Sequence, residues 1–123
     1  MSEKPVAERL QVKGSRHLAV IGAPADLESI IGARNVRTDV PNADVILLFA
    51  PDRARFDALL PTVLATSSRD AILWVAYRKL TSRLAADLSR DIIHRLAPEY
   101  RLDTVSQIAI DNDWSALRLK RMA

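Results

Sequence analysis

Three stretches of the chain are almost continuously apolar, which predicts buried strands. They span residues 17–22 (HLAVIG), 43–50 (ADVILLFA) and 71–77 (AILWVAY). Apolar runs of this length, bounded by charged or turn-forming residues, are typical of strands covered on both faces, as in a parallel sheet. We therefore expect these stretches to form the centre of a mostly parallel sheet.

Three further stretches predict strands of a different kind. Residues 35–40 (NVRTDV) are short and polar, which favours the edge of the sheet. Residues 104–111 and 115–122 are separated by only three residues, too few for a parallel crossover, so they should form an antiparallel hairpin.

Helical spacing of apolar residues occurs between these strands. Residues 6–10 predict a short helical turn and residues 25–33 a helix. The next helix should begin at Pro51, a good first helical residue, and Pro61 should kink or divide it. Residues 78–88 predict an ordered loop or irregular helix. A helix over 89–97 should be capped by Ser89 and end at Pro98.

This order of elements predicts a three-layer, Rossmann-like α/β sandwich. The expected strand order is 2-1-3-4 followed by the C-terminal antiparallel hairpin, which is a trimmed methyltransferase-like topology. Residues 37–42 are too few for the helix that such folds place between strands two and three, so we expect a loop along the sheet edge there. Residues 1–13 are expected to be an N-terminal segment, and 14–123 a single domain.

A ligand site is expected at the carboxyl ends of the strands, where open α/β sheets bind their ligands. Several residues follow predicted strands and should meet at this rim, together with the bend of the hairpin. The candidate ligand-binding residues are Gly22, Ala23, Pro24, Asp39, Arg53, Arg78, Lys79 and Trp114.

The turn at Gly22 departs from a nucleotide-binding fingerprint. The dinucleotide motif needs glycines two and five residues later, where this chain has Pro24 and Leu27. Asp39 lies 17 residues after Gly22, near the spacing of a ribose-binding acid. A structural turn is the favoured interpretation, and a turn for S-adenosylmethionine or a nucleotide is the alternative.

The charged and aromatic residues of the rim have two interpretations. The cluster of Arg78, Lys79 and Arg83 could hold a phosphate or an acidic partner, but pairing with nearby carboxylates is favoured. Those carboxylates are Asp52, Asp87 and Asp111. Trp114 could stack on a ligand, and packing against the sheet is favoured.

The composition excludes several kinds of chemistry. The 123 residues include no cysteine, so disulfides, thiol nucleophiles and thiolate metal sites are absent. His17 and His94 have no carboxylate at ligand spacing, and no serine has the context of a nucleophile. We therefore predict no catalytic and no metal-binding residue.

Charge and hydropathy indicate the surroundings of the protein. No apolar stretch is long enough for a membrane helix and the first residues do not form a signal peptide, so a cytoplasmic protein without a membrane partner is expected. The net charge is +3. The basic residues Arg118, Lys120 and Arg121 are expected to be ordinary surface, with weak nucleic-acid binding as an alternative.

Five segments resemble one family. These are GSRHLAVIGAP, ADVILLF, LWVAYRK, ADLSRDII and IDNDWSALRLKR, which together cover most of the chain from Gly14 onward. They are similar to the bacterial domain of unknown function 3052 family. The resemblance implies a small Rossmann-like cytoplasmic bacterial protein and assigns no catalytic residue.

Three functional hypotheses follow. The first is a non-catalytic module that binds a protein partner or an anionic small molecule at the rim and needs no cofactor. The second is a degenerate enzyme that binds S-adenosylmethionine or a nucleotide, with Asp39 on a ribose. The third is weak nucleic-acid binding. A homo-oligomer is compatible with each of them.

Overall fold

A five-stranded mixed sheet forms the centre of the protein. The computed structural model describes residues 4–122. The strands are β1 (Leu18–Ile21), β2 (Val45–Phe49), β3 (Ile72–Arg78), β4 (Leu102–Ala109) and β5 (Trp114–Arg121). They lie in the order β1-β2-β3-β5-β4. The first three are parallel, and β5 is antiparallel to both β3 and β4, which confirms the predicted central strands and C-terminal hairpin.

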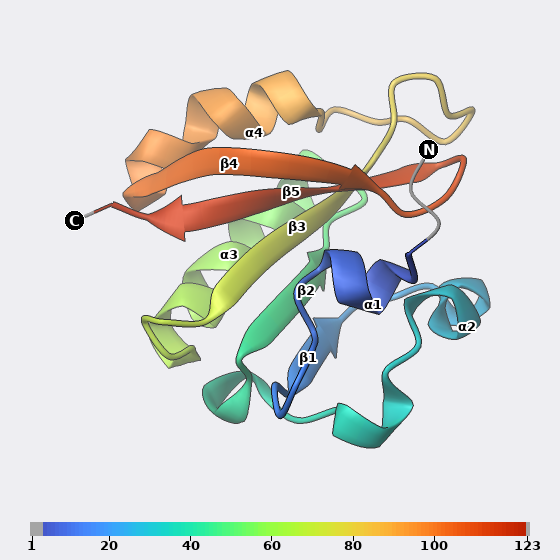
Figure 1. The fold of residues 1–123 in the computed structure, drawn as a ribbon. Helices are drawn as coiled ribbons and strands as arrows, with labels where there is room; N and C mark the ends of the chain where they lie inside the picture. Colours follow the sequence, from blue (N-terminus) through green and yellow to red (C-terminus); the bar gives the residue numbers. More distant parts are fainter. Residues whose placement is uncertain (1–3, 123) are drawn as a thin grey trace.

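The helices cover both faces of this sheet, so the architecture has three layers (Figure 1). On one face lie α1 (Val6–Arg9), a 3-10 turn at Ala25–Leu27 and α2 (Glu28–Ile31). On the other lie α3 (Arg53–Thr66), α4 (Arg90–Leu96) and a 3-10 turn at Ala97–Tyr100. Two further 3-10 turns, Arg34–Val36 and Val40–Asn42, connect α2 to β2. The predicted three-layer α/β fold is confirmed.

Each face of the sheet has its own apolar cluster. Because β2 is buried at every residue, its side chains alternate between the two clusters. Ile46 and Leu48 pack toward α3 and α4, whereas Val45, Leu47 and Phe49 pack toward α1 and α2. Residues of α1 belong to the second cluster, so this short helix packs directly on the sheet.

The polar edge strand predicted over residues 35–40 does not form, and this prediction is wrong. Only Arg37 pairs with the sheet, through a single parallel bridge to Leu18. Gly32 and Ala33, just before this segment, both have positive φ angles that turn the chain. The next residues form short 3-10 turns, as the predicted edge loop requires.

The helix after β2 differs from the prediction at two points. Asp52, not Pro51, marks its start, because the Asp52 side chain accepts a hydrogen bond of 2.8 Å from the Arg55 N–H. The helix is continuous from Arg53 to Thr66 and includes Pro61, so the predicted division into two helices is wrong. Pro61 is exposed, and the apolar side chains of Phe56, Leu60 and Val63 hold the helix on the sheet on either side of it.

Candidate ligand site at the carboxyl end of the sheet

The turns after the parallel strands gather at one end of the sheet, as predicted. Gly22 follows β1, Arg53 begins the helix after β2, and Lys79 follows β3. The hairpin bend joins them, because the Lys79 N–H donates to the Asp113 carbonyl oxygen over 2.8 Å. We call this end of the sheet the carboxyl rim.

Asp39 does not lie at the carboxyl rim. It is two residues beyond Arg37, which pairs with the first residue of β1, and it directly precedes the 3-10 turn that leads into β2. Its carboxylate accepts a hydrogen bond of 2.7 Å from the Asn42 side chain. Gly22 lies about 13 Å farther along β1 than Leu18, by the rise of a strand. The structure therefore separates Asp39 from the other candidate residues.

The turn at Gly22 is shaped by backbone conformation. Gly22 has a φ of +73°, which favours glycine. Pro24 lacks an N–H and caps the following 3-10 turn, while Ala23 packs partly against the apolar cluster of this face. The Leu27 N–H, another potential anion donor, is bonded to the Pro24 carbonyl oxygen at 3.0 Å. Neither Pro24 nor Leu27 therefore offers a free N–H to a phosphate.

Trp114 is a packing residue, which is the interpretation favoured from sequence. Only 4% of its surface is exposed. Its ring contacts Phe49 edge to face, with 5.0 Å between the ring centroids, and the Arg78 guanidinium lies over it at 4.7 Å. Arg78 therefore covers Trp114 by a cation–π contact.

The carboxylates of the rim bind backbone N–H groups. Asp52 caps α3, Asp87 accepts the Arg53 N–H at 2.8 Å, and Asp111 accepts the N–H groups of the bend. In the part of the chain that the structure describes, no ion pair joins these carboxylates to Arg78, Lys79 or Arg83. The predicted pairing at the rim is therefore wrong, because helix caps and turns take up these acids.

A hollow of about 390 Å³ opens beside the end of β3, on the face covered by α4. Its floor lies on three neighbouring strands, because Ser115 is in register with both Tyr77 and Ala109. Its walls come from the loop after β3, the start of α4 and strand β4. We call it the rim hollow, and its lining residues are Tyr77, Lys79, Leu80, Thr81, Ser89, Arg90, Asp91, Gln107, Ala109 and Ser115.

Polar side chains from four segments of the chain contribute to the lining of the rim hollow. Burial raises the pKa of Tyr77, and a hydrogen bond with Ser115 opposes this. Ser89 is buried and caps α4 through the Ile92 N–H. Lys79 and Arg90 supply two positive charges, and Asp91 supplies one negative charge.

The loop between Lys79 and Ser89 is fastened at both ends. The Ser82 hydroxyl donates to the Asp113 carboxylate over 2.8 Å, and Asp87 holds the start of α3. Leu80 at the mouth of the hollow remains 72% exposed. The hollow therefore has an ordered wall with an apolar side chain at its entrance.

Sequence reasoning found only Lys79 among the residues of the rim hollow. Tyr77, Ser89 and Arg90 were placed correctly at a strand end and a helix start, but nothing in their spacing shows that they meet. Gln107, Ala109 and Ser115 come from the hairpin, whose register decides which side chains reach the floor. A signal was present in the polar Tyr77 at the end of an otherwise apolar strand.

Comparison with known proteins supports the fold. No family model and no curated protein sequence matches this chain. Among solved structures, it is similar to the ribosomal protein L11 methylase from Lactobacillus delbrueckii subsp. bulgaricus, with a TM-score of 0.59 and 15% identity. This match covers 94% of the present chain and 74% of the methylase.

Two further solved structures have the same architecture. The B. subtilis M1A22 tRNA methyltransferase TrmK has a TM-score of 0.56 and 12% identity, over 98% of this chain and 66% of TrmK. DhpI, solved as a complex with SAH, has a TM-score of 0.52 and 9% identity, over 96% of this chain and 83% of DhpI. At these identities the likeness shows a Rossmann-like α/β fold and no more. The resemblance to the domain 3052 family stays a prediction.

Three features of the turn after β1 count against binding of the cofactor that these neighbours imply. Pro24 lacks a donor, Ala23 packs against the core, and Asp39 lies toward the other end of the sheet. Of the four hollows described, none is lined by Gly22 or Asp39. The turn thus has no donor at Pro24, and Asp39 lies away from it.

Two other structural findings bear on function. Within residues 4–122, no helix has the length and apolar character needed to cross a membrane. The same residues contain no group of three or more histidine, aspartate or glutamate side chains placed to hold a metal ion.

Proposed function

We propose that this protein is a non-catalytic binding module that holds an anionic small molecule in the rim hollow. The observation that carries the proposal is that two cations, Lys79 and Arg90, line one hollow together with the hydroxyl-bearing side chains of Tyr77 and Ser115. No ion pair of the described residues engages either cation. The volume of about 390 Å³ is in the range of small-molecule sites.

The chemistry of the lining favours a compact anion. Lys79 and Arg90 would donate charge-assisted hydrogen bonds to a carboxylate or phosphate, while hydroxyl groups of Ser115 and Thr81 offer neutral donors. Asp91 lies in the same hollow and would repel a second negative group unless a ligand hydroxyl or amine faced it. A small hydroxylated or amino-bearing acid meets these conditions.

The experiment is calorimetric titration with citrate, inorganic phosphate, pyrophosphate and ADP as probes. We expect one of them to bind at one site per chain and to lose about tenfold or more in affinity in the Lys79→Gln and Arg90→Gln variants. Arg95→Gln is the matched control, because Arg95 is an exposed cation of the same helix outside the hollow. Equal weakening by the control, or no saturable binding of any probe, would contradict the proposal.

A second candidate function is binding of S-adenosylmethionine at the turn after β1, favoured by the methyltransferase fold of the neighbours and by the SAH named in the DhpI structure. In that case S-adenosylmethionine should bind with high affinity, and Gly22→Val should weaken binding strongly, since a side chain at this positive φ would strain the turn. Lys79→Gln and Arg90→Gln should leave this binding unchanged. The two candidate functions therefore differ in which variants weaken ligand binding.

A further inference from the structure

Cations also gather at the opposite end of the sheet, far from the rim hollow. Two adjoining hollows of about 350 and 250 Å³ share Asp70, Ala71 and Ile72, just before and at the start of β3. We call the pair the amino-end trough. Five cations from three separate segments line it: Arg16, Arg69, Arg118, Lys120 and Arg121.

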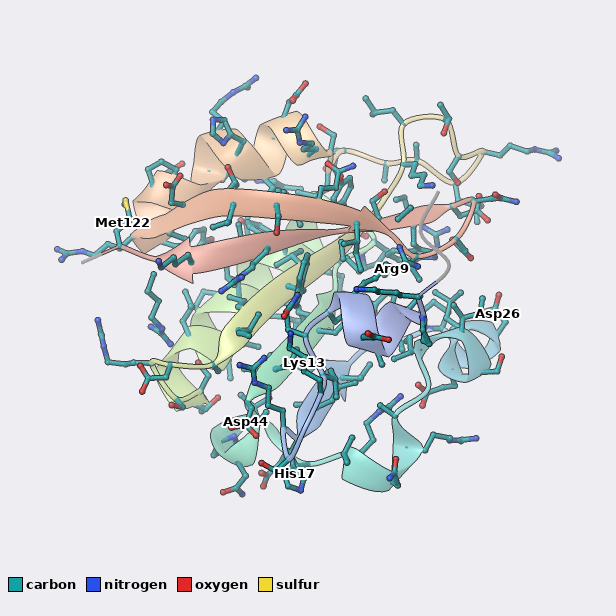
Figure 2. All side chains as sticks on the ribbon, viewed as in Figure 1. Arg9, Lys13, His17, Asp26, Asp44 and Met122 are labelled. Carbon is teal, nitrogen blue, oxygen red and sulfur yellow. The ribbon has the colours of Figure 1, made fainter. Side chains whose placement is uncertain are left out.

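The carboxylates of the trough do not balance these cations. Asp44 and Asp70 are the two acids among its lining residues. Asp44 already accepts the His17 N–H at 2.8 Å (Figure 2 shows Asp44 and His17 together at this end). Asp103 lies opposite Lys120 in register, yet the ion pairs of the described residues include neither of them nor any other trough cation.

Two of the arginines are held in place by the fold. The Arg121 guanidinium donates to the Leu64 carbonyl oxygen and the Ser67 hydroxyl, both at 2.8 Å. The Arg16 guanidinium donates to the Gln11 carbonyl oxygen at 3.0 Å. Each guanidinium has five N–H donors, so several remain for a ligand. Because these side chains are already held in place, they lose less conformational entropy when a ligand binds.

The two cations of β5 add a regular pattern. Arg118 and Lys120 are two residues apart on one strand, so their side chains leave the same face, about 6.6 Å apart along the strand. Arg118 is half-buried and Lys120 is exposed. Arg69 from the loop before β3 lines the same hollow, so the charges come from more than one segment and are not confined to a single point.

We propose that the amino-end trough binds the phosphate backbone of a nucleic acid without reading its base sequence. A trough of two joined hollows with cations along its length matches an extended polyanion better than one small anion. None of its lining residues is aromatic, so it offers no platform for base stacking. Contacts with phosphates alone are sequence-independent and depend strongly on salt.

The test is fluorescence anisotropy with labelled nucleic-acid duplexes of several unrelated sequences, titrated at increasing NaCl concentration. We expect similar affinities for all sequences and a negative slope of log affinity against log salt. Arg118→Gln and Lys120→Gln should each weaken binding to every sequence and reduce that slope by about 1. The double variant Arg83→Gln/Arg95→Gln removes two exposed cations outside the trough and should leave the slope unchanged.

Each other outcome counts against the proposal. Equal losses in the Arg83→Gln/Arg95→Gln control would show a general effect of net charge. A preference for one sequence, or binding that does not depend on salt, would exclude a backbone contact. Binding to vesicles of anionic lipid but not to the duplexes would assign the trough to a membrane surface instead. Because Lys120 is exposed, its variant keeps the test valid if Arg118→Gln fails to fold.

Discussion

Two adjacent residues, Gly32 and Ala33, show how single backbone conformations shape this protein. Gly32 has a φ of +67° and a ψ of −148°, a region occupied almost only by glycine. Ala33 follows in the left-handed region, with a φ of +54° and a ψ of +36°. The chain therefore stores some strain where it leaves α2 and turns along the sheet edge.

Substitutions at these two positions should change stability in opposite directions. Gly32→Ala is expected to lower the free energy of unfolding by about 1–3 kcal/mol, because its Cβ forces an unfavourable conformation although the surrounding space is open. Ala33→Gly relieves the left-handed strain and should be neutral or stabilising by up to about 1 kcal/mol. Chemical denaturation of both variants measures this, and a stabilising Gly32→Ala would contradict it.

The ion pair between Glu28 and Arg37 should make stability depend on pH. The Arg37 guanidinium donates to both Glu28 oxygens, at 2.9 and 3.3 Å, and this hydrogen bonding lowers the Glu28 pKa from its ordinary value of 4.5. A lowered folded pKa contributes stability that is present above the unfolded value and lost as pH falls through the folded value.

We therefore expect Glu28→Gln to destabilise the protein at neutral pH, with a difference that shrinks as the pH falls below about 4.5. Denaturation curves of the two proteins over this pH range give the measurement. In an Arg37→Met background most of the pH-dependent part of the difference should vanish, because the remaining charge, that of Arg34, lowers the Glu28 pKa least. Its persistence there would mean that another group causes it.

At the scale of elements, α1 depends on the sheet for its existence. A helix of four residues is not stable alone. Val6 and Leu10 are buried on the sheet, and the Trp74 indole N–H donates to the Leu10 carbonyl oxygen at 3.0 Å. The Arg9 guanidinium also reaches the Ala109 carbonyl oxygen at 2.8 Å, at the end of β4.

Trp74→Phe should release the end of α1. The buried Leu10 carbonyl oxygen would lose its side-chain donor, and we expect a loss of about 1–3 kcal/mol in stability. Hydrogen exchange should accelerate at the Leu10 amide, which bonds to Val6, more than at the Ile93 amide in α4. Equal acceleration at both amides would indicate global unfolding without local release.

The helices and strands show how much of the fold could be predicted from the sequence. The three apolar strands and the Ser89 cap are confirmed, because burial and capping are recorded in local residue types. The strand predicted over residues 35–40 does not form, because a polar segment pairs with a sheet only where the neighbouring residues position it there. Pro61 was expected to kink or divide α3. It does not divide the helix, because the packing of Phe56, Leu60 and Val63 outweighs one missing N–H.

The candidate site was predictable only in part. Parallel strands bring their carboxyl ends together, so the meeting of Gly22, Arg53 and Lys79 followed from the topology. The hydrogen-bond partners of the charged side chains could not be predicted in the same way. Asp52, Asp87 and Asp111 bind backbone N–H groups, and these contacts depend on the folded structure. The binding role of the candidate residues stays a prediction.

At the scale of the whole molecule, the rim hollow and the amino-end trough lie at opposite ends of β3. Tyr77 lines the first and Ile72 lines the second, five residues or about 17 Å apart by the rise of a strand. No residue lines both hollows, and a rigid strand connects them. The two proposed sites should therefore act independently.

This independence gives a prediction for combined variants. Lys79→Gln should weaken binding of the small anion without changing the affinity for duplexes. Lys120→Gln should weaken binding of duplexes without changing the affinity for the small anion. In the double variant, each loss should equal that of the corresponding single variant, within about 0.5 kcal/mol. Titrations of both ligands with all four proteins provide the measurement. A larger deviation would show that the sheet couples its two ends.

The outer edge of the sheet is protected against pairing with another chain. Strand β4 is the outer strand, and its register with β5 shifts between Thr104 and Gln107. Such a bulge twists an edge away from a flat conformation that could pair with another chain. Val105, which lies in the bulge, is 53% exposed.

The position of Met122 has a practical consequence for work with this protein. Met122 follows β5 and lines the trough, at the end of the sheet opposite Asp26 (Figure 2). A purification tag joined after this residue would emerge beside Arg69 and Lys120. A tag rich in aspartate or glutamate would compete for those side chains and conceal binding of a nucleic acid, so protein for these measurements should carry a neutral extension there.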